Sequence, residues 1–285
     1  MTASEDNEQT DLVRLRDWVG KTATDQDVAN VRHANLMAAT IDLEKRFSAG
    51  DPMPALWHWL YFPEGLPASQ LGVEGHTARG DFLPPVPLAN RLWAGGRFEF
   101  DGQVALGATM DKRSEVIRIE HKHGATGALV FVTVIHEIFS EGKRRIREEH
   151  DIVYKNPSPP AKGLPAPSSD DGPVSRATWT PDIIQLFRYS ALTFNSNRVH
   201  YDVEYCREAE GYDSVVVHGP LSATMLAALA SRIAAQPLRS FHYRARKPAL
   251  LGDSLKLGSQ LDGRSVHVWT QLPDGNIGME ATARW

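Results

Sequence analysis

A polar cluster between residues 189 and 202, which reads YSALTFNSNRVHYD, carries the side chains best suited to chemistry. The cluster follows the end of a predicted helix, so residues 195–199 should form a loop with His200 at its exit. Eighteen residues further on, His218-Gly219-Pro220 opens a second predicted helix, because Pro is favoured in the first turn. Free N–H groups and a partial positive charge at a helix start suit a developing oxyanion. An imidazole has an unperturbed pKa of about 6.5, so His200 could act as a base close to neutral pH.

The second half of the chain supplies the elements that position this cluster. A helix is predicted to open at residues 180–182, with Thr180 as N-cap, and to end at about Thr193. Another runs from Gly219 to a stop before Pro237, and its positions are apolar or small nearly all round, which indicates burial on most sides. Strands separated by short turns follow, over residues 240–246, 254–261, 265–272 and 276–284.

The first half shows the same order of elements. Residues 11–47 are predicted to be mostly helical, and the aromatic run at 55–62, ALWHWLYF, must be buried. Strand-like segments follow, with short turns that favour antiparallel neighbours, over residues 97–100, 115–121, 128–139 and 145–154. Residues 156–173 contain six prolines and are typical of a linker.

The repeated order predicts an α+β, double hot-dog fold, in which two antiparallel sheets each wrap around a central helix. We expect an N-terminal hot-dog over residues 11–155, a Pro-rich linker over 156–173, and a C-terminal hot-dog with the polar cluster over 174–285.

Composition excludes several classes of protein. The formal net charge of −4 argues against nonspecific binding of nucleic acid. The single cysteine, Cys206, excludes a disulfide framework and a Cys-rich zinc module, and we see no other set of metal ligands. No apolar stretch is long enough to span a membrane, and the acidic, polar start is unlike a signal peptide. We therefore expect a cytoplasmic protein without membrane binding, metal or cofactor.

The polar cluster and the His-Gly helix start resemble the MaoC-like, or hydratase 2, family of (R)-specific enoyl-CoA hydratases, whose motif can be written G-D-x-N-P-x-H followed by H-G. The resemblance places the catalytic histidine on His200, the motif asparagine on Asn197, and the helix-opening pair on His218 and Gly219. The catalytic aspartate falls on Asn195, which cannot act as a general base and can only hydrogen-bond and hold a water molecule. Acid–base chemistry would then rest mainly on His200.

The departures from the motif point to a narrower group. The motif's glycine and proline fall on Phe194 and Arg198, and the first half carries WHW at 57–59, FLPPVPL at 82–88 and WAGG at 93–96. With these segments the chain looks like the mesaconyl-C4-CoA (3-methylfumaryl-CoA) and itaconyl-CoA hydratases, and it is similar to mitochondrial 3-hydroxyacyl-thioester dehydratases. The resemblance implies a first half that has lost the catalytic residues. It also implies hydration of a C5 dicarboxylic acyl-CoA to citramalyl-CoA, with coenzyme A as part of the substrate.

The expected site residues follow from this chemistry. An α,β-unsaturated thioester becomes electrophilic at its β-carbon when its carbonyl oxygen is hydrogen-bonded, and the Gly219 N–H would bind that oxygen. Close packing alone would also call for glycine there. We expect Asn197, His218 and Tyr189 to contact the substrate, although His218 could equally hold the loop by a hydrogen bond.

A second carboxylate on the acyl group requires a cation near its far end. Arg suits bidentate binding of a carboxylate better than Lys. The candidates are Arg198, inside the motif, and Arg91, with Arg79 and Arg188 as further possibilities.

Three other functions remain open. A dehydratase of 3-hydroxyacyl chains on acyl carrier protein or CoA would need a long apolar tunnel and a basic docking patch. A hot-dog thioesterase would need a carboxylate beside the water, and Asn195 argues against it. A non-catalytic acyl-CoA-binding module would not depend on His200. By analogy with other hot-dog proteins, the chain could form a homodimer.

Overall fold

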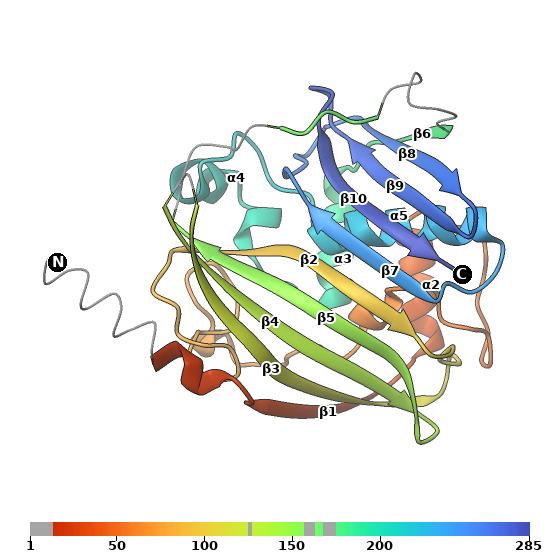
Figure 1. Ribbon diagram of the computed structural model, residues 1–285, viewed down its shortest axis with the longest axis horizontal. Coiled ribbons are helices and arrows are strands. Elements are labelled where there is room, and N and C mark those ends of the chain that lie inside the picture. Colours follow the sequence, from red (N-terminus) through yellow and green to blue (C-terminus); the bar gives the residue numbers. More distant parts are fainter. Residues whose placement is uncertain (1–13, 125–126, 157–162, 168–174) are drawn as a thin grey trace, which may run out of the picture.

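The computed structural model describes residues 14–124, 127–156, 163–167 and 175–285. Its strands form one sheet, in the order β1-β3-β4-β5-β2-β7-β10-β9-β8-β6, which curves around the helices (Figure 1). The strands are β1 (Thr22–Val28), β2 (Asn90–Phe100), β3 (Thr109–Gly124), β4 (Gly127–Ser140), β5 (Lys143–Lys155), β6 (Ser175–Trp179), β7 (Ser240–Ala245), β8 (Leu255–Asp262), β9 (Ser265–Gln271) and β10 (Ile277–Arg284). The helices are α2 (Val31–Thr40), α3 (Ile183–Thr193), α4 (Val203–Tyr205) and α5 (Gly219–Ala234). Short 3₁₀ or π turns lie at Arg16–Trp18, Trp57–Leu60, Ala68–Gln70, Arg198–His200 and Cys206–Glu210.

In the second half, α5 packs against β7, β9 and β10, and the sheet wraps around it (Figure 1). Its small and apolar residues allow burial on most sides, and Leu221, Leu226 and Ala230 are all fully buried. Strands β7 to β10 follow the predicted segments within one or two residues. Within the ranges that the structure describes, no helix has the length and apolar character needed to cross a membrane.

Two local predictions in the second half were wrong or incomplete. Asp182, not Thr180, is the N-cap of α3, because its side chain accepts a hydrogen bond from the Gln185 N–H at 2.7 Å. Strand β6, which pairs with β8, was not predicted.

The first half departs further from expectation. The predicted helical stretch over 11–47 is wrong at residues 22–28, which form the edge strand β1 against β3. Six of the seven β1 residues are exposed, so no apolar face distinguishes this strand in the sequence. In the described part of this range, α2 is the one helix longer than a 3₁₀ turn, and it packs on α3.

The central helix expected in the first half is replaced by aromatic side chains. The aromatic run folds around the 3₁₀ turn Trp57–Leu60, and its side chains contact rings on β2 and hydrogen-bond Glu148 on β5. The ring of Trp59 lies 4.9 Å from that of Trp93 and 5.6 Å from that of Phe98. These rings fill part of the concave face that α5 fills in the second half.

The two expected sheets are joined edge to edge through β2 and β7. Gly95 pairs with Arg244 and Gly96 with Tyr243, at a point where the register of β2 shifts against β5. A Cβ on Gly95 would lie 2.8 Å from the Tyr243 carbonyl oxygen, and one on Gly96 would lie 2.6 Å from Cε1 of the same tyrosine. The two glycines of the WAGG segment therefore let the halves approach closely.

Part of the predicted linker runs beside the start of β10. The Ile277 N–H donates to the Leu164 carbonyl at 2.7 Å, and the Ala166 N–H donates to that of Gly275 at 3.0 Å. The remaining linker residues, 157–162 and 168–173, lie outside the described residues.

Substitution of Gly96 tests the junction. We expect Gly96→Ala to lower the free energy of unfolding by about 1–3 kcal/mol, because the added methyl overpacks the contact with Tyr243. Urea denaturation of the full chain measures this. Gly65→Ala is the matched control, since a Cβ there has no neighbour within 4 Å; equal losses in the two variants would contradict the prediction.

Candidate active site

Two asparagines build the loop that presents His200. Helix α3 ends at Phe194, whose backbone is left-handed with φ of 50°, and the Asn195 N–H donates to the Ser190 carbonyl at 2.8 Å. The Asn195 side-chain oxygen accepts from the Asn197 N–H at 3.0 Å. The oxygen of Asn197 then caps the turn Arg198–His200. Short-range caps therefore hold the polar cluster together, and the side-chain oxygen of Asn197 is used in one of them. The substrate contact expected of Asn197 stays a prediction.

The hydrogen bonding of His200 fixes where its proton lies. Nδ1 lies 2.8 Å from the carbonyl oxygen of Val216, which can only accept, so Nδ1 carries the proton. In the neutral ring the lone pair is then on Nε2, to which no described protein group donates. Burial lowers the pKa of His200 to about 4, although the bond to Val216 acts in the opposite direction. At neutral pH the ring is therefore an uncharged base.

His218 supports His200 from behind. It is fully buried, and its ring is stacked on that of His200 at a centroid distance of 3.7 Å and an interplanar angle of 21°. Its Nε2 is 2.8 Å from Oγ of Ser190 on α3. Burial, and then the neighbouring His200, lower its pKa. Of the two roles considered for His218, this geometry corresponds to holding the site together.

The start of α5 lies next to this pair of rings, because His218 is its N-cap residue and Gly219 its first residue. No side chain caps this end, so the first-turn N–H groups are not consumed by a capping residue. A Cβ on Gly219 would meet its nearest neighbour, Cε of Met279, only at 3.9 Å. The expectation that packing demands glycine here is therefore wrong.

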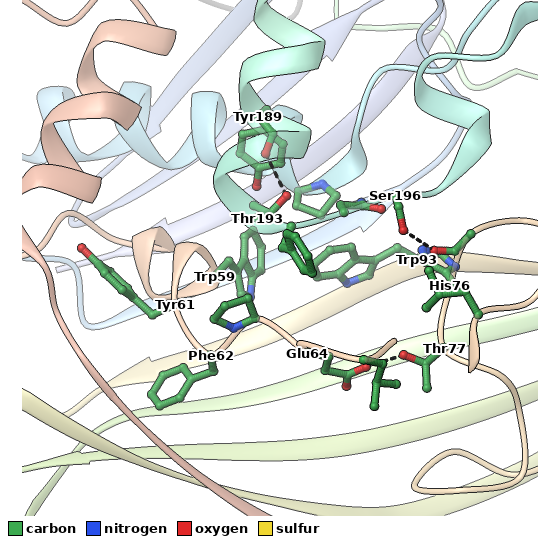
Figure 2. A pocket seen from close by; sticks show the side chains of 17 residues that line it. Trp59, Tyr61, Phe62, Glu64, His76, Thr77, Trp93, Tyr189, Thr193 and Ser196 are labelled. Atoms are coloured by element: carbon green, nitrogen blue, oxygen red, sulfur yellow. Dashed lines mark hydrogen bonds between the residues drawn. The ribbon is translucent and has the colours of Figure 1, made fainter. Parts of the chain in front are cut away.

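A cavity of about 280 Å³ lies between the two halves of the chain. Figure 2 shows Trp59 and Trp93 on one side of it and Tyr189 and Thr193 on the other; Tyr61 and Phe62 line it as well. Asn195 lines it as well, as does Pro220 of α5. His200 and Gly219 are not among the lining residues, although their loop and helix neighbours are. The only lining carboxylate, that of Glu64, accepts a hydrogen bond from Thr77 at 2.5 Å.

Residues 72–77 of the first half contact the loop that carries His200. The Arg198 N–H donates to the Glu74 carbonyl at 2.9 Å, and Ser196 Oγ donates to that of Gly75 at 2.6 Å (Figure 2). Gly75 has φ of +87°, and a Cβ there would lie 2.0 Å from the Ser196 carbonyl oxygen. Glycine is thus required both by its backbone conformation and by the contact.

His76 belongs to the site and was not predicted. It lines the cavity, and burial, followed by the charges of Arg91, His200 and Arg79, lowers its pKa to about 3. It lies in a Pro/Gly-rich stretch without periodicity, so the sequence offers only its residue type as a signal.

None of the four arginines suggested for a distal carboxylate lines the cavity. Arg198 is paired with Asp202 at 2.7 Å and stacks on Tyr205. Arg79 donates to backbone carbonyls between Val86 and Ala89. Arg188 is exposed on α3. Arg91 pairs with Tyr154 in the sheet, and its charge lowers the pKa of His76.

Comparison with known proteins agrees with this architecture. A sequence model of the family "Hydroxyacyl-thioester dehydratase type 2" matches residues 56–251. The chain belongs to this family. Mesaconyl-C(4)-CoA hydratase of Chloroflexus aurantiacus is 37% identical to it over 271 residues, which cover 93% of this chain and 95% of the relative. As a member of the hydroxyacyl-thioester dehydratase type 2 family, the chain is an enzyme of the hydro-lyase class.

Solved structures confirm the fold. A MaoC-like dehydratase matches with a TM-score of 0.71 at 17% identity, covering 95% of this chain and 99% of that one. A Mycobacterium tuberculosis protein described as having a double hotdog fold matches with a TM-score of 0.59 at 12% identity, covering 93% and 96%. The predicted α+β double hot-dog is confirmed.

Ser190 tests how the two histidines are held. We expect Ser190→Ala to reduce the free energy of unfolding by about 1–2 kcal/mol, because it removes the partner of the buried His218 Nε2. Chemical denaturation measures the change. Ser231→Ala on α5 is the control, since the Ser231 hydroxyl makes no hydrogen bond to any described residue; a loss confined to the control would refute the assignment.

Proposed function

We propose that this enzyme adds water to an α,β-unsaturated acyl-CoA thioester whose acyl group is a branched C5 dicarboxylic acid. Mesaconyl-C4-CoA is the first candidate, because the relative that is 37% identical carries that substrate in its name. Itaconyl-CoA, whose double bond lies β,γ to the thioester, is the second. The product in both cases would be citramalyl-CoA, with the proton added at the α-carbon of mesaconyl-C4-CoA but at the methylene carbon of itaconyl-CoA. The observation that carries the proposal is the neutral His200 imidazole, with its lone pair on Nε2, at the open start of α5.

The reaction uses groups already in place. The Gly219 N–H hydrogen-bonds the thioester oxygen and stabilises the enolate that forms when water attacks the β-carbon. The amide nitrogen of Asn195 donates to the water oxygen, since its side-chain oxygen is engaged by Asn197. His200 accepts the water proton on Nε2 and returns a proton to the α-carbon. The sum is one water added across the double bond.

This chemistry requires no metal and no redox cofactor. Addition of water changes no net oxidation state, and the thioester is activated by a backbone hydrogen bond. Coenzyme A enters as part of the substrate.

The lining favours a short acyl group over a long one. A dehydratase of long 3-hydroxyacyl chains, which the family name also covers, needs an extended apolar tunnel. Here the indoles of Trp59 and Trp93 line the cavity. The same two indoles also line a second cavity, which has polar side chains in its lining. We therefore rank the C5 substrate first.

Replacement of His200 tests the proposed base. We expect His200→Ala to lower kcat for mesaconyl-C4-CoA hydration by roughly 10²–10⁴-fold, which is the usual contribution of a positioned acid–base group. The assay follows loss of the conjugated thioester absorbance, with circular dichroism as a check on folding. His123→Ala, an exposed histidine at the end of β3, is the control. Near-normal turnover by folded His200→Ala would refute the role.

The pH profile tests the protonation state. His200 must be deprotonated to accept a proton, so activity should be lost only below its lowered pKa of about 4. We expect kcat/KM to stay level from neutral pH down to about pH 5 and to fall near pH 4, since kcat/KM reports groups of the free enzyme. An acid limb centred near 6.5, the value of an unperturbed imidazole, would contradict the buried neutral base.

A further inference from the structure

A second cavity, of about 180 Å³, lies in the first half beneath the Trp57–Leu60 turn. The inner faces of β3, β4 and β5 form its floor, with Lys112, His136, Glu148 and His150 among the lining residues. Four aromatic residues line both this cavity and the one described above, namely Trp59, Tyr61, Phe62 and Trp93. The two spaces therefore meet at the aromatic side chains that replace the central helix.

Two imidazole nitrogens at this second cavity have no partner. Nδ1 of His58 and Nε2 of His150 are buried and make no hydrogen bond in the described structure. Buried polar atoms are almost always hydrogen-bonded, so two such atoms around one cavity indicate a polar group that binds there. No three of the described His, Cys, Asp and Glu side chains, here or elsewhere, are arranged to hold a metal ion.

Lys112 brings a positive charge to the same space; burial lowers its pKa, and the charges of Asp25, Glu64, Glu148 and Asp27 act in the opposite direction. Its Nζ lies over the ring of Phe62, 4.7 Å from the centroid, and no described carboxylate lies within 4.0 Å of it. The one carboxylate that lines the cavity is engaged elsewhere, because Glu148 accepts from His58 Nε2 at 3.0 Å and from Trp59 Nε1 at 3.1 Å. Burial alone would raise the pKa of Glu148, but the hydrogen bond and charge of His58, with the other histidines, lower it to about 2. Glu148 is thus ionised and orients His58 and Trp59.

We propose that this cavity binds the distal carboxylate of the dicarboxylic acyl group, with Lys112 as its counter-ion and His150 Nε2 as a hydrogen-bond donor. The inference rests on the proposed function and names the part of the protein that selects its substrate. A carboxylate satisfies the ammonium and the imidazole together. An acyl group ending in a methyl would leave both unpaired, and a site built for polar contacts discriminates strongly against such an analogue. The arginines named from the sequence are engaged in other contacts or lie outside the cavity lining, whereas Lys112 is a cation among the described residues that line the second cavity.

Substrate selectivity is the test. The measured quantity is the ratio of kcat/KM for mesaconyl-C4-CoA to kcat/KM for crotonyl-CoA, which lacks the distal carboxylate. We expect Lys112→Met to lower this ratio roughly 10- to 100-fold, the size of a charge-assisted contact. Lys112→Arg, which keeps the cation, should restore part of the ratio, and His150→Gln should lower it less than Lys112→Met. Lys122→Met, on the same strand but exposed and paired with Glu120, should leave the ratio unchanged.

The outcomes separate this inference from the proposed function. If the unmodified enzyme prefers mesaconyl-C4-CoA and Lys112→Met loses both substrates equally, or neither, the carboxylate site is refuted and the hydratase function stands. If the unmodified enzyme hydrates crotonyl-CoA as well as the dicarboxylic thioester, the site is refuted in the same way. If it hydrates no unsaturated acyl-CoA, the proposed function fails and the inference fails with it.

Discussion

The chemistry of the site depends on one backbone carbonyl, that of Val216. Its oxygen accepts from His200 Nδ1 at 2.8 Å, and the N–H of the same residue donates to the Val199 carbonyl at the same distance. The segment is fixed from its other side by a bridge between Val216 and Leu250. Because a carbonyl oxygen can only accept, the hydrogen bond from His200 Nδ1 to Val216 sets both the orientation of the imidazole and its tautomer. Nε2 is left as the only basic atom of the ring. The role proposed for His200 as the base depends on this.

In the proposed mechanism, burial of this imidazole has a chemical cost that the rest of the site must offset. His218 covers one face of the His200 ring, and burial lowers the pKa of His200 to about 4, so the ring is uncharged at neutral pH. A base of low pKa accepts a proton less readily. The electrophile must therefore be correspondingly more reactive, and the uncapped start of α5 is where that activation can come from. The weak base and the open helix end are thus two parts of one arrangement.

The sequence was a good guide wherever one residue pattern decided the outcome locally. The near-continuous small and apolar positions of α5 and the alternation in β7 to β10 predicted those elements, and the loop caps kept Asn195, Asn197 and His200 together. Prediction from the sequence failed where the structure of a segment depends on residues that are distant in the chain. Strand β1 has no apolar face and exists because β3 pairs with it. The sequence does not show that His76 and Lys112 line cavities, because the side chains around them come from distant parts of the chain. Arg198 looked available because its partner Asp202 was read as part of the same polar cluster.

The division of labour between the halves follows from the loss of a helix. A second buried helix like α5 would fill the concave face of the first half and leave no room for an acyl group. Aromatic side chains at Trp57–Leu60 fill that face only in part, and both cavities border them. The same half contacts the loop that carries His200, where the left-handed Gly75 lets its backbone touch Ser196. In the proposed mechanism the second half supplies the reacting groups, while the shape of the substrate site and the contacts that hold the loop depend on the first. Neither half forms this site without the other, which gives a physical reason for joining them through the tight glycine contact between β2 and β7.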